Sequence, residues 1–365
     1  MIYIQALLLT LVLSLAACAE PKFDEARIIQ PTRSQSPVID MHAHIAGIGA
    51  GGSNCYVSPD LRNNWRYDIY LKAFGLTQKD LEEHGDQLAF EKASQRLAVS
   101  QQVDGAVILA LDGVVNQAGE LDLERTEVYI PNDFVSRETA KYDNLFFGAS
   151  INPYRKDALQ RLEQVKADGA VLIKWLPAIQ QIDPSDLRLT PFYSKLIELE
   201  LPLLVHTGAE RSFSRANDDL GDPMLLRLPL ELGVTVIAAH VATTGKTDSE
   251  SNFERLVGLF PEYPNLYADI SSLTQLNKLW YLPKVLDHPE IHDRLLYGTD
   301  FPLGETSLFG VRLVSPWYFP FRLGWARLRH IARIENPWDR DLELKKALGF
   351  GPEIFTRPAK LLKIK

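Results

Sequence analysis

Cysteine is scarce in this chain: Cys18 and Cys55 are the only two among 365 residues, so at most one disulfide could form within it. A basic excess is also absent, because 39 Lys and Arg face 47 Asp and Glu and the net charge is -8. Proteins that bind nucleic acid need positive charge against the phosphates, so nucleic acid is excluded as a partner. The chain has no internal repeat, low-complexity tract or long run of like charge. Its 46% apolar and 24% charged residues are typical of a soluble globular protein.

The first residues differ from the rest. Residues 2–17 carry no charge and are mostly apolar. This length fits the core of a signal peptide and is short for a membrane span, which needs about 20 residues. The small residues before Cys18 resemble the lipobox of bacterial lipoproteins, in which the cysteine becomes the lipidated N-terminus.

This resemblance predicts three parts: a lipoprotein signal peptide (1–17), a lipid-anchored tether (18–37) and a folded domain (38–365). Ala19, in the place of Asp, favours transfer to the outer membrane, so we expect a periplasmic protein anchored to the membrane through lipid at Cys18. Cys55 would then have no disulfide partner. Neither Lys nor Arg precedes the apolar core, which departs from the pattern, and the alternatives are an ordinary cleaved signal or an uncleaved anchor.

Short apolar runs alternate with helical patterns over the rest of the chain. The predicted strands cover residues 38–44, 106–111, 145–150, 170–175, 203–206, 234–240, 265–270 and 294–300. Eight strands, each followed by helical pattern, predict an α/β fold of the (β/α)8 TIM-barrel type, with residues 301–365 as a C-terminal extension. A doubly wound open sheet is the alternative, but no glycine-rich phosphate loop follows the first strand.

Ligand-type side chains stand at the ends of five of these strands. In β/α barrels the active site lies at the carboxyl ends of the strands, so these side chains should converge there. His42 and His44 are two apart, which on a strand places them on one face. Singly, each residue has an ordinary explanation as a core histidine, an ion-pair lysine or a turn-capping aspartate; together they favour a site. The set is His42, His44, Lys174, His206, His240 and Asp300.

The motifs around these residues resemble the metal-dependent amidohydrolase superfamily. They are His-Ala-His at 42–44, Val-His-Thr-Gly at 205–208, Ala-Ala-His at 238–240 and Tyr-Gly-Thr-Asp-Phe-Pro at 297–302. Within the superfamily they look most like the branch that includes aminocarboxymuconate-semialdehyde decarboxylase. The resemblance covers about 38–300 and implies the barrel fold and a divalent metal, with zinc favoured.

The resemblance also implies roles. His42, His44, His206 and Asp300 would be metal ligands, and Asp300 would also move protons. His240 would orient or deprotonate the attacking water or polarise the substrate. Lys174 stands where some members carry a carboxylated lysine that bridges two metals, so a carboxylated Lys174 implies two ions. An unmodified Lys174 implies one, which is usual in this branch, and leaves the amine free to meet an anionic substrate.

Three histidines and a carboxylate leave a position on the metal for water and lower its pKa to about 7. We therefore predict an enzyme that hydrolyses an amide, lactone or ester bond of a small molecule. A nonoxidative decarboxylase on the same scaffold and a non-catalytic metal-binding lipoprotein are the alternatives. The sequence leaves open whether the chain forms a homo-oligomer.

Residues just past the strand ends are expected to set specificity. Trp175, Arg211, Arg215 and the insertion 47–65 are the predicted pocket wall, and either arginine could hold a substrate carboxylate. The alternative for the two arginines is simple solvation in an exposed loop.

Overall fold

Eight short strands of buried residues form one parallel sheet in which the spatial order follows the order along the chain. They are β1 (Ile39–Ala43), β3 (Gly105–Leu109), β5 (Leu145–Ala149), β6 (Leu172–Trp175), β7 (Leu203–His206), β8 (Val236–Ala239), β11 (Leu266–Asp269) and β12 (Leu295–Leu296). The computed structural model describes residues 36–365 except 211–212, 214, 276–277, 279, 303–306, 309–310 and 313–321. At 66, 307–308 and 311–312 it describes the backbone alone.

The sheet closes into a barrel through backbone hydrogen bonds between its two end strands. The N–H of Met41 donates to the carbonyl of Tyr297 (3.2 Å), and the N–H of Asp300 donates to the carbonyl of His42 (2.8 Å). Because all eight strands run in the same direction, their carboxyl ends meet at one rim. The (β/α)8 barrel predicted from the sequence is confirmed.

A β-bulge in β1 decides which way its side chains point. Asp40 pairs with Ala106 and Ala43 with Ile108, so β1 contains one residue more than β3 between these two pairs. An extra residue reverses the inward and outward alternation of a strand. Met41 before the bulge therefore faces the barrel interior, and His42 after it faces the same way, into the cavity.

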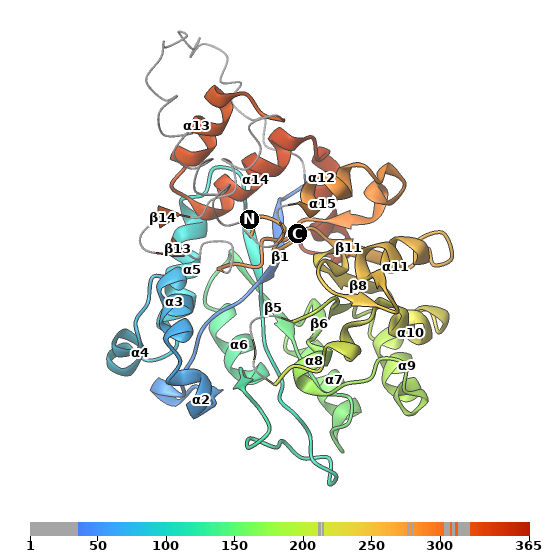
Figure 1. The fold of residues 1–365 in the computed structure, drawn as a ribbon. Helices are drawn as coiled ribbons and strands as arrows, with labels where there is room; N and C mark the ends of the chain where they lie inside the picture. The colour runs from blue at the N-terminus through green and yellow to red at the C-terminus, as the bar shows by residue number, and fades with distance from the viewer. Residues whose placement is uncertain are drawn as a thin grey trace. The chain divides into compact units, whose positions relative to one another are not determined.

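Helices cover the outside of the barrel (Figure 1). Between the strands lie α5 (Leu88–Ala98), α6 (Asn132–Thr139), α7 (Ala158–Ala167), α8 (Pro177–Gln180), α9 (Thr190–Glu198), α10 (Arg227–Glu231), α11 (Asn252–Leu259) and α12 (Tyr281–Leu286). In α5 the buried residues Phe90, Ala93 and Leu97 recur every three or four positions, which places one face of the helix on the sheet. Short 3-10 helices complete the connections: η4 (Leu187–Leu189), η5 (Asp218–Gly221), η6 (Pro223–Leu226), η7 (His240–Ala242) and η8 (Pro289–Arg294), with the ribbon β9 (Lys246–Thr247) and β10 (Glu250–Ser251).

A long insertion separates β1 from α5. It contains η3 (Ala50–Gly52), β2 (Tyr56–Val57), α2 (Pro59–Arg62), α3 (Trp65–Phe74) and α4 (Gln78–His84), which lie together in Figure 1. The Asp86 carboxylate fixes the loop that follows the two histidines, because it accepts the N–H groups of Ile48 (3.0 Å) and Gly49 (2.9 Å) and the hydroxyl of Ser53 (2.5 Å). β2 pairs antiparallel with β4 (Val128–Tyr129), so the insertion is joined to the loop after β3.

The C-terminal extension contains the ribbon β13 (Ser307–Leu308) and β14 (Val311–Arg312) and the helices α13 (Trp325–Arg333), α14 (Pro337–Leu348) and α15 (Pro352–Leu361). Ala359 and Leu362 join the apolar cluster that fills the barrel interior, with Ile39, Met41 and Leu204 among its members. The end of the chain therefore closes the barrel on the side opposite the carboxyl ends of the strands.

The last strand is much shorter than predicted. The strand predicted over 294–300 spans Leu295–Leu296, and Asp300 has a φ of 63°, which a strand residue does not adopt.

The predicted signal peptide, Cys18 and nearly all of the tether lie outside the described residues. Residues Ser36–Lys365 form one compact unit. Among the described residues, no helix is both long and apolar enough to span a membrane.

Candidate metal centre

His42, His44 and Asp300 come together at the carboxyl ends of the first and last strands. The Nε2 atom of His42 lies 3.5 Å from Oδ1 of Asp300, and Nε2 of His44 lies 3.2 Å from the same oxygen. His42 and Asp300 are buried, and about a quarter of the His44 side chain is exposed. Gly298 permits this approach of the chain ends, because a Cβ there would lie 3.0 Å from the Cβ of His42.

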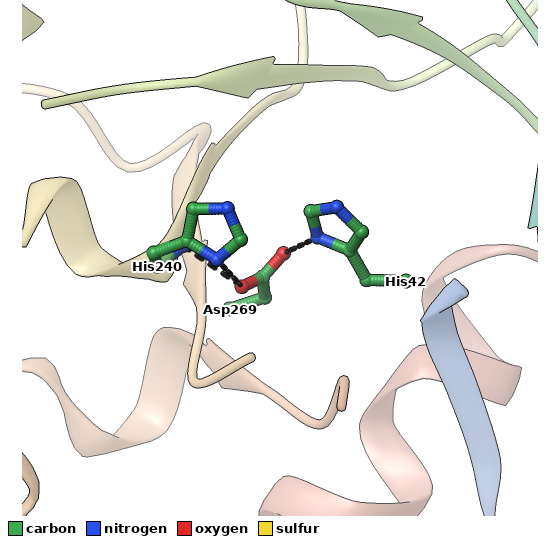
Figure 2. A group of neighbouring side chains, drawn as sticks. All are labelled: His42, His240 and Asp269. Atoms are coloured by element: carbon green, nitrogen blue, oxygen red, sulfur yellow. Dashed lines mark hydrogen bonds and ion pairs between the residues drawn. The ribbon is translucent and has the colours of Figure 1, made fainter. Parts of the chain in front are cut away.

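A second carboxylate, Asp269 at the end of β11, orients two of the histidines. Its Oδ2 atom lies 2.9 Å from Nδ1 of His42, and its Oδ1 atom accepts the backbone N–H of His240 (2.9 Å). A carboxylate only accepts, so Nδ1 of His42 carries the proton. Nδ1 of His240 lies 3.2 Å from the carbonyl oxygen of Ser271 and carries a proton for the same reason. Figure 2 shows the other ring nitrogen of each histidine on the side away from Asp269.

His42, His240 and Asp269 also meet the distance criterion for a metal group. The oxygens of Asp269 are occupied, however, by the N–H groups of His42, His240 and Ser271 and by the Ser271 hydroxyl. Asp269 is therefore a support that fixes the tautomer of His42 and the backbone of His240, and the Nε2 atoms of both rings face away from it. Hydrogen bonding of the remote ring nitrogen to a carboxylate is the usual arrangement behind a metal-binding histidine.

The surroundings keep His42, His206 and His240 neutral and Asp300 ionised. Burial, and after it the charge of Lys174, lowers the pKa of His42 to about 4. Burial also holds the pKa values of His206 and His240 well below the usual range. Burial alone would raise the pKa of Asp300, but the hydrogen bond from His44 and the charge of His42 outweigh it and hold that pKa well below its ordinary value.

His206 and His240 extend the cluster from β7 and from the end of β8. Their rings lie 5.0 Å apart between centroids, and the ring of His240 stacks on that of His42 at the same distance. Nε2 of His206 is buried and has no hydrogen-bond partner among the described residues. An oxygen of the Glu210 carboxylate lies 3.4 Å from this nitrogen, which is longer than a normal N–H···O hydrogen bond.

The backbone at His240 adopts an uncommon conformation. His240, Val241 and Ala242 have φ values of 57°, 50° and 49°, in the left-handed region that side chains other than glycine disfavour. Such residues cost about 1–3 kcal/mol each and persist where the surroundings dictate them. Here the bond from the His240 N–H to Asp269 is one such determinant.

Lys174 of β6 completes the inner ring of polar groups. Its ammonium lies 3.1 Å from Nε2 of His42 and donates to that lone pair. Burial lowers the pKa of Lys174 to about 8, against the opposing charges of Asp269 and Asp300.

Asp40 supports the site from the other face of β1. Its carboxylate accepts the N–H groups of His42 (3.0 Å) and Thr299 (2.9 Å) and the indole N–H of Trp338 in α14 (2.8 Å). Burial raises the pKa of Asp40 to about 6, although the hydrogen bonds oppose this. Asp40 thus links the backbone beside two predicted metal ligands, His42 and Asp300, to the C-terminal extension.

A cavity of about 340 Å³ is lined by His42, His44, Lys174, His206, His240 and Asp300. Its polar part contains the cluster together with Glu210, Ser272, Gln275 and Lys278. Its apolar part comes mainly from the insertion and from β4, through Val57, Leu61, Tyr67, Tyr70, Leu71, Phe74, Val128 and Ile130. The site is therefore a buried metal-ligand cluster with an apolar chamber beside it.

A family model described as amidohydrolase matches residues 39–306, which is more than half of the chain. The chain belongs to the amidohydrolase family. Enzymes of this fold use a divalent metal, and the group His42, His44 and Asp300 could bind one. A search of curated protein sequences finds no match.

Two solved structures with TM-scores above 0.5 agree on the fold. A proposed 2-pyrone-4,6-dicarboxylic acid hydrolase from Pseudomonas putida is 14% identical, with a TM-score of 0.54 over 90% of this chain and 98% of the other. An uncharacterized TIM-barrel protein from Bordetella bronchiseptica is 16% identical, with a TM-score of 0.52 over 85% and 99%. A 5-carboxyvanillate decarboxylase from Sphingomonas paucimobilis is 9% identical, with a TM-score of 0.39 over 90% and 99%. Identities this low do not choose a reaction within the amidohydrolase family.

Two of the predicted pocket residues lie elsewhere. Trp175 is fully buried outside the barrel, against Phe192 and Tyr193 of α9, and its indole N–H donates to the carbonyl of Ile151 (2.7 Å). Strand alternation explains this, because Lys174 points inward and its neighbour must point outward.

Arg215 does not line the cavity either. It is exposed, its guanidinium pairs with Asp60 (3.1 Å), and it donates to the carbonyl of Glu124 (2.7 Å). These contacts link the loop after β7 to the insertion. The third predicted residue, Arg211, lies outside the described residues.

Asp269, Glu210 and Lys278 are among the residues of the site that were not predicted. Asp269 had a signal, because it ends the strand predicted over 265–270 just as the other ligand-type residues end theirs. Glu210 and Lys278 lie in loops after strands, where sequence pattern gives no direction to a side chain.

The residues present fit a divalent metal. The lone pair of His42 Nε2 and the carboxylate of Asp300 face one another at 3.5 Å, and the Lys174 ammonium that donates to this lone pair supplies a positive charge beside them. The observation that points to a metal is the buried Nε2 of His206, which has no hydrogen-bond partner among the described residues. Neutral imidazoles and a carboxylate are the donors that zinc and its neighbours prefer. His42, His44 and Asp300 would hold the ion, with His206 at a greater distance in the same cavity.

Proposed function

We propose that this amidohydrolase-family protein is a metal-dependent hydrolase that cleaves an amide, lactone or ester bond of a small molecule with a water nucleophile. The meeting of His42, His44 and Asp300 within 3.5 Å at the wall of a cavity is the observation that carries the proposal. When bound, the metal supplies a Lewis acid for the scissile carbonyl and lowers the pKa of water to about 7.

Asp300 is the general base in this proposal. Its low pKa keeps it ionised at neutral pH, so it can accept a proton from the attacking water and return it to the leaving group. Gln275 holds the outer carboxylate oxygen through its amide N–H (3.4 Å), which leaves the inner oxygen toward the two histidines.

His240 orients the reacting groups. Its Nδ1–H is held by Ser271, so the lone pair of Nε2 faces the cavity and can accept a hydrogen bond from the water. Lys174 donates to His42 and stays available to an oxygen of the substrate.

A nonoxidative decarboxylase is the second candidate. Two buried ammonium groups in the cavity, Lys174 and Lys278, favour it, because a decarboxylase must bind a carboxylated substrate. The metal ligands would be the same, and the products would differ.

Turnover of a panel of lactones, esters, amides and carboxylated aromatics tests both candidates. The purified protein is assayed as isolated, after chelation and after return of zinc or manganese, with products identified by mass spectrometry. We expect activity to be lost on chelation and restored by metal, with water added across the bond. Release of carbon dioxide would select the decarboxylase. Turnover that chelation leaves unchanged would overturn the proposal.

We also propose lipid attachment at Cys18, on the basis of the apolar run and small residues before it. Labelled palmitate should enter the wild-type protein in bacterial cells and fail to enter the Cys18→Ala variant.

A further inference from the structure

The cavity beside the metal centre has a second buried cation. Lys278 follows β11 and is 93% buried, and its side chain lines the cavity together with the metal cluster. Its ammonium donates to the hydroxyl of Ser272 (2.9 Å). This is the one hydrogen-bond partner that it has among the described residues.

A buried ammonium carries three donors and costs free energy unless acceptors surround it. Lys345 shows how this chain satisfies such a group where it is structural. That lysine is fully buried and donates to the carbonyl of Gly298 (2.8 Å) and to the carboxylate of Asp341 (2.7 Å). Among the described residues, Lys278 has neither a carbonyl nor a carboxylate at that distance, and its side chain borders the cavity.

The opposite part of the cavity is apolar. The insertion contributes Leu61, Tyr67, Leu71 and Phe74, and they share the lining with Lys278 and the metal cluster. Phe74 is held by an edge-to-face contact with Phe301, whose carbonyl accepts the N–H of His44. A ligand that fills the cavity therefore needs an apolar body and an oxygen that accepts from an ammonium.

We propose that Lys278 is a substrate-binding residue and that the substrate is a small amphipathic carboxylate, with its carboxylate on Lys278 and its aromatic or alkyl body against the insertion wall. This inference rests on the proposed function and deepens it by naming the substrate class. It does not depend on which bond is cleaved.

The volume agrees with this class. A cavity of about 340 Å³ is at the small end of the range for sites that enclose drug-sized ligands. A single aromatic ring with a short acid arm fits this space. The charge of Lys278 also interacts with the charges of Asp300 and Glu210. The alternative is therefore that Lys278 only balances these two carboxylates, and the experiment must distinguish this role from substrate binding.

The test compares phenylacetate with phenylacetamide, which have the same shape and differ in charge. Binding of each to metal-free protein is measured by titration calorimetry, so that no metal can bind the carboxylate. We expect wild-type protein to prefer phenylacetate by about tenfold or more, as a charge-assisted hydrogen bond predicts. Acetate, which lacks the apolar body, should bind more weakly than phenylacetate.

Lys278→Met should abolish the preference for phenylacetate and leave phenylacetamide binding unchanged, and Lys278→Arg should keep most of the preference. Lys284→Met is the control, because it removes one positive charge outside the cavity lining, where Lys284 pairs with Glu254 (2.5 Å), and it should leave the preference in place. Lys278→Gln replaces the Met variant if that variant does not fold, as judged by circular dichroism.

Equal affinity of the wild type for the two probes would overturn the inference. So would a preference that survives Lys278→Met, or one that is lost equally in Lys284→Met. Because these measurements use metal-free protein, they stand apart from the metal-dependent turnover that tests the proposed function.

Discussion

Trp338 gives the sharpest test of how the C-terminal extension supports the metal centre. Its fully buried indole stacks on Phe301 (4.3 Å between centroids) and donates its N–H to Asp40 (2.8 Å). Asp40 in turn accepts the backbone N–H groups of His42 and Thr299. Trp338→Phe keeps the stacking and removes the donor, so it loosens the carboxylate that fixes these two segments.

The structure sets the size of the effect. A hydrogen bond to a buried charged group contributes about 2 kcal/mol to the free energy of unfolding. The smaller ring also leaves a gap that costs about 1 kcal/mol. We therefore expect Trp338→Phe to lower the free energy of unfolding by about 3 kcal/mol. Loss of groups that orient metal ligands weakens metal binding by about 10–100-fold, and this more remote change should reach about tenfold.

Trp175→Phe is the matched control. Trp175 is equally buried, but its N–H donates to a neutral carbonyl outside the barrel. This variant should lose about 2 kcal/mol, from a neutral hydrogen bond and a similar gap, and should bind zinc as the wild type does. Urea unfolding and zinc titration of both variants measure the difference. Wild-type zinc affinity in Trp338→Phe would refute the positioning role of the extension.

Two further predictions concern protonation and catalysis. Metal-free protein should lose stability as the pH falls from about 6.5 toward 4, because the lowered pKa values of His42, His206 and His240 mean that the unfolded chain takes up protons first. His42 alone accounts for a loss of about 3 kcal/mol in the free energy of unfolding. The raised pKa of Asp40 acts in the opposite direction over about pH 4 to 6 and offsets the effect of one of the three histidines. Urea midpoints that stay constant between pH 7 and 5 would contradict this prediction. Asp300→Asn should reduce kcat by at least about 100-fold with the fold intact, because the amide cannot accept the proton, and near-normal turnover with unchanged circular dichroism would remove Asp300 from the role of base.

The sequence predicted the barrel and most of the cluster because strand ends leave a regular signal. Apolar runs mark the strands, and in a parallel barrel all their carboxyl ends meet at one rim, so His42, Lys174, His206 and His240 could be placed together without coordinates. Asp269 also lies at the carboxyl end of its strand, but it was not predicted, because this strand has a single ligand-type residue and no histidine.

The remaining features depend on geometry that pattern does not encode. The bulge in β1 sets the direction of His42, yet the run Ile-Asp-Met-His-Ala contains no glycine or other mark of an extra residue. Trp175 was misplaced because proximity to a strand end says nothing of the face on which a side chain lies. Lys278 lies in a loop after β11, whose course depends on tertiary contacts.

The metal content of the purified protein tests the central claim most directly. Elemental analysis of the wild type, combined with mass spectrometry of the peptide that holds Lys174, should give about one divalent ion per chain and an unmodified lysine, as expected for a mononuclear site. The variants His42→Ala and Asp300→Ala should lose the ion, and Arg215→Ala, which alters a surface contact, should retain it. Protein that holds no divalent metal after reconstitution, or that retains it in both ligand variants, would contradict the account.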